Sequence, residues 1–215
     1  MMIPKLTFND GGRLRFTADT HFGHSQQAKR RGFDDIDEHD NFLIHRWNAA
    51  VRKDDFVFHA GDFAHKCPPD RLERIFSRLN GRKFLILGNH DDQATAALPW
   101  AAPASHRFLL QIGSKDKQVQ IVIDHYGGRT WYNSHHGVLQ LYGHSHGGLP
   151  ATKQSCDIGV DAWEEKAPIT IWDALQRMKE ATITLREVQD LIPGGPRCET
   201  RDDEEDEAEP TVPTI

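Results

Sequence analysis

Short apolar segments that end in acidic, amide or imidazole side chains are the feature that most constrains this chain. The clearest segment, residues 83–87, is short enough for a buried strand and too short for an ordinary helix. It leads directly into Gly88-Asn89-His90-Asp91. Open α/β sheets bind their ligands in the crevice beyond the carboxyl ends of their strands. We therefore expect these polar residues at such an edge of a sheet.

Four more segments have the β-branched, aromatic or alternating apolar residues typical of strands and end in the same way. They end at Asp19-Thr20-His21-Phe22-Gly23-His24, at Gly61-Asp62, at Asp124-His125 and at Gly143-His144-Ser145-His146. Each motif alone is compatible with an ordinary surface turn. Because strand ends on one edge of a sheet converge, their joint occurrence predicts one shared site.

Turn residues and apolar periodicity predict a layered α/β fold with mixed sheets. The predicted helices cover residues 35–51, a stretch that follows Pro68-Pro69, and residues 170–181. The predicted hairpins join 3–8 to 13–18, about the turn Asn9-Asp10-Gly11-Gly12, and 107–112 to 117–123. One more strand is expected near 156–160, and Lys29-Arg30-Arg31 is expected in a solvated loop.

The length of 215 residues suits one domain with a sizeable core. The net charge of −6 comes from residues 193–215, which hold eight acidic and two basic residues, whereas residues 1–192 hold 24 of each. We predict a domain over 1–192, followed by an acidic, disordered tail over 193–215. The neutral body argues against tight binding of duplex nucleic acid.

The three cysteines, Cys67, Cys156 and Cys198, are widely spaced and form no C-x-x-C pair. This usage argues against a disulfide framework and against a thiolate zinc site. The first residues lack the profile of a secretory signal, and no apolar run reaches membrane length. Together these features predict a cytoplasmic protein that does not bind a membrane.

The side chains at the strand ends form a nitrogen and oxygen ligand set without sulfur, which suits divalent ions such as Mn, Fe or Zn. Two carboxylates, an amide and four imidazoles are too many for one tetrahedral ion. They divide naturally over two ions that share a carboxylate. Paired cations activate a water molecule and hold phosphoryl oxygens, and a further imidazole can protonate the leaving oxygen.

In residue type and in order, these motifs resemble those of the calcineurin-like metallophosphoesterases. The longer start Thr17-Ala18-Asp19-Thr20-His21-Phe22-Gly23-His24, with residues 157–161, looks like the small bacterial and phage branch of that family. The resemblance implies a four-layer α/β/β/α sandwich, in which two facing mixed sheets carry the site at one sheet edge. It also implies two divalent metal ions, with Mn favoured over Fe, Zn and Ni.

The resemblance further implies a role for each residue. One metal would be held by Asp19, His21, Asp62 and His146, and the other by Asp62, Asn89, His125 and His144, with Asp62 bridging. By the resemblance, His90 would be the general acid and Asp91 would support the ligands. From the sequence itself, His24 is expected either to contact a substrate phosphate or to cap the following segment, and His136 is expected to line the site. His135 and His136 are alternatives to His125, which is preferred because it ends an alternating strand. The remaining histidines, including His39, His59 and His65, are expected to be ordinary.

These inferences predict a metal-dependent phosphohydrolase that cleaves phosphomonoesters or phosphodiesters by in-line attack of a metal-bridging hydroxide. Its substrates would be phosphorylated small molecules or nucleotide-type compounds. Gly61-Asp62 is not followed by the Asp-Arg pair of the protein Ser/Thr phosphatases, which argues against that subclass. A nuclease acting on DNA or RNA, and a non-catalytic binding scaffold on the same fold, are the alternatives.

Overall fold

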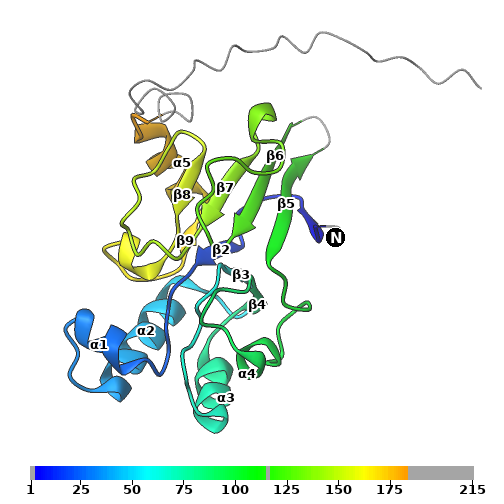
Figure 1. Cartoon of the computed structure of the whole chain (residues 1–215). Helices are drawn as coiled ribbons and strands as arrows, with labels where there is room; N and C mark the ends of the chain where they lie inside the picture. The colour runs from blue at the N-terminus through cyan, green and yellow to red at the C-terminus, as the bar shows by residue number, and fades with distance from the viewer. Residues whose placement is uncertain (1–2, 115–116, 184–215) are drawn as a thin grey trace, which may run out of the picture.

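The computed structural model describes residues 3–114 and 117–183 and places two mixed sheets face to face (Figure 1). The four-stranded sheet has the order β4-β3-β2-β9. Its strands are β2 (Leu14–Thr17), β3 (Phe56–His59), β4 (Arg82–Leu85) and β9 (Ile169–Thr170). The first three are parallel, and β9 pairs antiparallel to β2. Their carboxyl ends therefore lie at one edge, as the sequence predicts.

The five-stranded sheet has the order β1-β5-β6-β7-β8. Its strands are β1 (Lys5–Phe8), β5 (Arg107–Ser114), β6 (Lys117–Asp124), β7 (Leu139–Tyr142) and β8 (Ser155–Asp157). The β5–β6 pair is antiparallel and confirms the predicted hairpin. The pairs β6–β7 and β7–β8 are parallel. As a result β6 and β7 deliver their following loops to the same edge.

The hairpin predicted between residues 3–8 and 13–18 is wrong. β1 pairs in parallel with β5, whereas β2 belongs to the facing sheet and pairs with β3 and β9. The turn residues are real, but they let the chain cross between sheets. Gly11 is needed at this crossing, because a Cβ there would lie 2.8 Å from Cγ2 of Ile171.

The main core lies between the two sheets and is built from alternating strand residues. On the four-stranded sheet, the Phe58 ring stacks on Phe84 at 4.7 Å and on Phe16 at 5.9 Å between centroids. Phe108 of the facing sheet meets Phe58 edge-on at 6.3 Å. This interlocking of rings fixes how the sheets face each other and confirms the predicted two-sheet sandwich.

Helices cover the outer face of the four-stranded sheet. They are α2 (Ile36–Ala50) and α3 (Pro69–Arg78), both close to their predicted positions. Trp47 and Phe76 pack there with Val57, which points away from the main core. Helix α2 begins where the Asp35 side chain accepts hydrogen bonds from the backbone N–H groups of Asp37 and Glu38.

The remaining helices are shorter or lie at the margin of the sandwich. Residues 25–30 form α1 (Ser25–Arg30), which buries Gln27 and Ala28, so Lys29 and Arg30 lie in a helix rather than in the expected loop, and Arg31 follows its end. α4 (Gln93–Ala96) follows β4, and α5 (Ile171–Glu180) packs against β2, β8 and β9. α5 begins with a Thr170–Asp173 capping box.

The outer face of the five-stranded sheet is covered, within the described residues, by the segment between β6 and β7. Trp131 of this segment packs on Leu109 and Val122, and its indole N–H donates to the Val138 carbonyl at 2.7 Å. The segment includes the 3₁₀ helix η1 (Ser134–His136); a second one, η2 (Val160–Ala162), follows β8.

The predicted boundary at 192 and the acidic tail lie outside the described residues. Across residues 3–114 and 117–183, no helix has the length and apolar character of a membrane span.

Candidate metal centre

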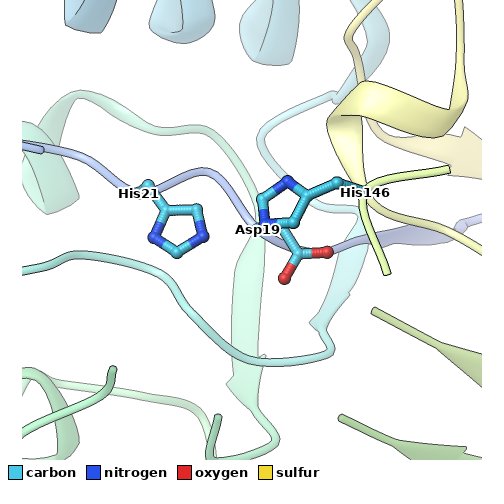
Figure 2. A group of neighbouring side chains, drawn as sticks. All are labelled: Asp19, His21 and His146. Carbon is cyan, nitrogen blue, oxygen red and sulfur yellow. The ribbon is translucent and has the colours of Figure 1, made fainter. Parts of the chain in front are cut away.

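Two groups of three potential ligands lie at the carboxyl edge of the sheets. Asp19, His21 and His146 form the first triad; Asp62, His125 and His144 form the second. Within each triad, the ligand atoms all lie within 4.8 Å of one another. Figure 2 shows the Asp19 carboxylate and the rings of His21 and His146 around one space between loops. The structure thus brings six of the seven predicted ligands into two clusters.

The Asp62 carboxylate faces both triads. Its Oδ2 lies 3.6 Å from Nε2 of His21, and its Oδ1 lies 3.6 Å from Nε2 of His125. A second link runs through the backbone, since the N–H of His144 donates to the Asp19 carboxylate oxygens at 3.0 and 2.9 Å. The triads therefore form one continuous site rather than two separate ones.

Five of the six triad residues have the left-handed backbone conformation that non-glycine residues seldom adopt. Their φ angles are 57° at Asp19, 49° at His21, 58° at Asp62, 67° at His144 and 48° at His146. Only three other non-glycine residues of the described chain share this conformation. Strain of this kind costs about 1–3 kcal/mol per residue and clusters at functional sites. The concentration here indicates that the loops are shaped for their side chains.

Glycines allow these loops to approach one another closely. A Cβ on Gly88 would lie 2.2 Å from Oδ1 of Asp62, and a Cβ on Gly61 would lie 2.4 Å from Nδ1 of His125. A Cβ on Gly143 would lie 2.9 Å from Oδ2 of Asp19. The glycine in each of these motifs therefore has a steric role that leaves room for the ligand groups.

In the first triad, burial disfavours the charged forms of His21 and Asp19. Both ring nitrogens of His21 are buried without a hydrogen-bond partner. Burial, followed by the charges of His146 and Arg31, lowers the pKa of His21 to about 2. Burial also raises the pKa of the Asp19 carboxyl to about 8. A divalent cation would accept the lone pair of a neutral His21 and offset the buried charge of Asp19, so these residues fit a metal ion.

The second triad has its imidazole orientation fixed from behind. Nδ1 of His125 donates to the Ala60 carbonyl at 2.8 Å, which leaves the lone pair on Nε2. That Nε2 lies 2.9 Å from Oδ1 of Asn89, and burial lowers the pKa of the His125 ring. The seventh predicted ligand, Asn89, therefore adjoins the second triad. A ring nitrogen and an amide oxygen directed at each other suit a shared divalent ion.

Asp91 holds the loops that carry Asp62 and Asn89. Its carboxylate accepts backbone hydrogen bonds from Asp62 at 2.9 Å, Phe63 at 2.8 Å and Gly88 at 2.8 Å. Burial raises the pKa of Asp91 to about 6, although these bonds act in the opposite direction. Asp91 thus supports the candidate ligands Asp62 and Asn89 through the backbone. The N–H of His90 donates to Oδ1 of Asp62 at 2.9 Å.

Three further histidines border the first triad. The His24 and His65 rings lie 4.5 Å apart, and the His65 and His90 rings 4.4 Å apart, between centroids. His90 is also 5.3 Å from His21. The structure therefore brings His24 and His90 to the site, together with His65, which sequence reasoning treated as ordinary. No motif or spacing marks His65, because it follows the Gly61-Asp62 motif in an irregular loop.

His136 is not brought to the site. It is exposed in η1 and lines a shallow hollow with Gln118 and Val119, at the beginning of β6. His125 follows the other end of that strand. His135, its neighbour in η1, is also exposed, and neither residue belongs to a triad. Their clustering in the sequence was a misleading signal, because a long connection separates them from the strand end.

Two residues that sequence reasoning treated as ordinary support the first triad from behind. The buried His59 ring donates from Nε2 to Oγ1 of Thr20 at 3.0 Å, and that hydroxyl donates to the Phe63 carbonyl at 2.8 Å. His39 accepts a hydrogen bond from Arg31 at 3.0 Å. These contacts join residues that are 8 to 43 positions apart in the sequence, so no local pattern predicts them.

Comparisons with known proteins identify several similar chains. Gene 66 protein of Mycobacterium phage L5 is 26% identical over 178 residues, covering 69% of this chain and 86% of the relative. Gene 66 protein of Mycobacterium phage D29 is 28% identical over 181 residues, covering 72% and 90%. An uncharacterized protein of Methanocaldococcus jannaschii is 34% identical over 82 residues, covering 37% and 47%.

A solved structure, a protein of unknown function from Aquifex aeolicus, superposes with a TM-score of 0.51 at 19% identity, covering 83% of this chain and 98% of that one. This likeness concerns the fold alone. The sequence model of the calcineurin-like phosphoesterases matches residues 12–178, which include both triads, Asn89 and His90. The chain therefore belongs to the calcineurin-like phosphoesterase family of metal-dependent hydrolases.

Proposed function

We propose that the chain is a binuclear phosphohydrolase whose two divalent ions, Mn²⁺ favoured, share the Asp62 carboxylate. The observation that carries this proposal is the position of Asp62, with one carboxylate oxygen 3.6 Å from His21 and the other 3.6 Å from His125. Asp19, His21 and His146 would complete one ligand set, and Asn89, His125 and His144 the other. When bound, the ions would supply an activated water and neutralise phosphoryl charge.

His90 is the proposed general acid. Its ring belongs to neither triad, yet it borders His21 at 5.3 Å and is half-buried at the site. His65 packs edge-on against it at 4.4 Å, which restricts the ring's orientation. A proton delivered from His90 to the leaving oxygen removes the need to expel an alkoxide.

Tyr126 supports an aromatic or nucleotide-type ester as substrate. The residue is 53% exposed, although its ring packs edge-on against His144 at 4.6 Å. It lines a hollow of about 280 Å³ with Leu87 and Arg107, and His125 forms part of the same wall. A group attached to a phosphorus beside the second triad would reach this hollow, where Tyr126 offers a stacking face.

The position of Arg31 weakens the nuclease alternative. The sequence offered Lys29-Arg30-Arg31 as a basic stretch, but the Arg31 side chain is only 3% exposed and pairs with Asp161. It is thus not free to contact a phosphate backbone.

Cys67 and Cys156 are free and buried, in keeping with the proposed cytoplasmic location.

The test uses the purified chain with Mn²⁺ and two phosphodiesters, one with a p-nitrophenolate and one with an alkoxide leaving group. We expect chelation to abolish hydrolysis of both. His90→Ala should lower kcat about 10²–10⁴-fold for the poor leaving group and much less for the good one. His45→Ala, an exposed histidine of α2, is the matched control. Equal effects on both substrates would remove His90 from the acid role.

A further inference from the structure

An arginine–aspartate pair, in which the Arg31 side chain is 3% and the Asp161 side chain 14% exposed, adjoins the first triad and is used by none of the steps above. Nε of Arg31 donates to Oδ1 of Asp161 at 2.9 Å, and Nη2 donates to Oδ2 at 2.7 Å. This is a bidentate pair between two groups that are 130 positions apart in the chain. Asp161 in turn lies against the triad, with Oδ2 2.8 Å from Nδ1 of His146.

The other donors of Arg31 hold the loop that carries Asp19. Nη2 donates to the Asp19 carbonyl at 2.6 Å, and Nη1 donates to the Thr20 carbonyl at 2.8 Å. Asp19 is one of the residues with a strained, left-handed backbone, with φ of 57°. One guanidinium therefore fixes the Asp19 loop and the carboxylate behind His146 at the same time.

The contact with Asp161 also decides which nitrogen of His146 can bind a metal. A carboxylate only accepts hydrogen bonds, so it holds the proton of His146 on Nδ1 and leaves the lone pair on Nε2. Carboxylates behind ligating histidines act in this way in metal sites, where their loss typically lowers metal affinity 10–100-fold.

The pair is anchored to the helical layer through α2 and α3. Because a guanidinium only donates, Nε2 of His39 accepts from Arg31 at 3.0 Å, and Nδ1 of His39 then donates to Oδ1 of Asp40 at 2.9 Å. Arg71 of α3 donates to Oδ2 of Asp40 at 2.6 Å. This series of hydrogen bonds fixes the position of the Arg31 guanidinium.

We propose that Arg31 and Asp161 are positioning residues for the first metal: Asp161 sets the tautomer of His146, and Arg31 locks Asp161 to the Asp19 loop. This inference rests on the proposed binuclear centre. It predicts that the pair controls the affinity of one metal site and leaves the other unchanged.

The experiment measures Mn²⁺ binding to the metal-free full chain by calorimetry and by electron paramagnetic resonance. Wild type should bind two ions. Asp161→Asn should lower the affinity of one site 10–100-fold, because the amide can donate to Nδ1 of His146 and move its proton to Nε2, while the other site stays within twofold. Asp55→Asn is the control, because Asp55 is likewise the partner of an arginine, Arg15, at 3.3 Å, and its side chain is even more buried than that of Asp161. It should leave both sites within twofold.

Arg31→Lys provides a second variant that keeps the positive charge. A lysine cannot span both oxygens of Asp161 and two carbonyls, so the same site should weaken about tenfold. If Asp161→Asn does not fold, the metal affinities of Arg31→Lys alone test the inference. Wild-type affinity at both sites in the folded variants would overturn the inference and leave the proposed function standing. Fewer than two ions in wild type would instead overturn the proposed binuclear centre itself.

Discussion

Asp91 offers the sharpest test of how the site is held together. Its carboxylate accepts three backbone hydrogen bonds: Oδ2 accepts from Asp62 and Gly88, and Oδ1 accepts from Phe63. Asp91→Ala removes all three acceptors. Asp91→Asn keeps one oxygen, which can still serve Asp62 and Gly88, and turns an NH₂ group towards the N–H of Phe63.

The expected magnitudes follow from these contacts. Each buried N–H left without an acceptor costs about 1–3 kcal/mol, so Asp91→Ala loses roughly 3–9 kcal/mol before relaxation and solvent access reduce it. Both variants recover the cost of ionising a buried carboxyl whose pKa is raised to about 6, at most about 3 kcal/mol at pH 7.5. We expect Asp91→Ala to be destabilised by about 2 kcal/mol, and Asp91→Asn to stay within about 1 kcal/mol of wild type.

Urea unfolding at pH 7.5 in the presence of a chelator, followed by tryptophan fluorescence, measures both variants without any metal contribution. Asp54→Ala is the control, because Asp54 belongs to an exposed pair with Arg13 that should contribute little. Equal stability of the Ala and Asn variants would refute the reasoning. It would mean that the retained oxygen does not hold the loops of Asp62 and Gly88.

Three further outcomes follow from the structure. Gly61 and Gly32 both have positive φ, +94° and +86°, but only at Gly61 would an added Cβ meet another group, Nδ1 of His125 at 2.4 Å. Gly61→Ala should therefore lower the free energy of unfolding by at least about 2 kcal/mol more than Gly32→Ala. Equal losses of stability in urea would contradict the close approach. Burial lowers the pKa of His59 to about 3, so its contribution to stability is present above pH 6.5 and lost as pH falls towards 3. Between pH 7.5 and 5 the free energy of unfolding of wild type should fall by about 2 kcal/mol more than that of His59→Gln. An equal fall for the two proteins in urea unfolding would be the contrary result. Tyr126→Ala should raise KM for an aryl phosphodiester about 2–10-fold with kcat nearly constant, whereas an unchanged KM would remove Tyr126 from substrate binding.

Much of the fold could be predicted because its signals are local. Helices α2 and α3 carry apolar residues at helical spacing, and the β5–β6 hairpin joins adjacent segments. The prediction of the first hairpin was wrong because the turn at Asn9-Asp10-Gly11-Gly12 determines only where the chain changes direction. The partner of β1 is β5, about a hundred residues away, and no turn signal encodes that choice. Helix α1 was missed because six residues are too few for a periodic pattern.

The candidate site divides in the same way. The positions of the candidate ligands could be predicted because each follows a strand and carries a side chain of a metal-ligating type. The groups that hold them could not. Asp161 supports His146 across 15 positions, and Arg31 reaches Asp161 across 130. Such partners are chosen by tertiary packing, so their residue types and spacing carry no recognisable signal.

The central claim is that one carboxylate serves two metal ions. Anomalous diffraction from crystals grown with Mn²⁺ tests it most directly. The account predicts two peaks, roughly 3.5–4 Å apart, one beside Asp19, His21 and His146 and the other beside His125 and His144, with Asp62 contacting both. A single peak, or two peaks of which only one contacts Asp62, would contradict it.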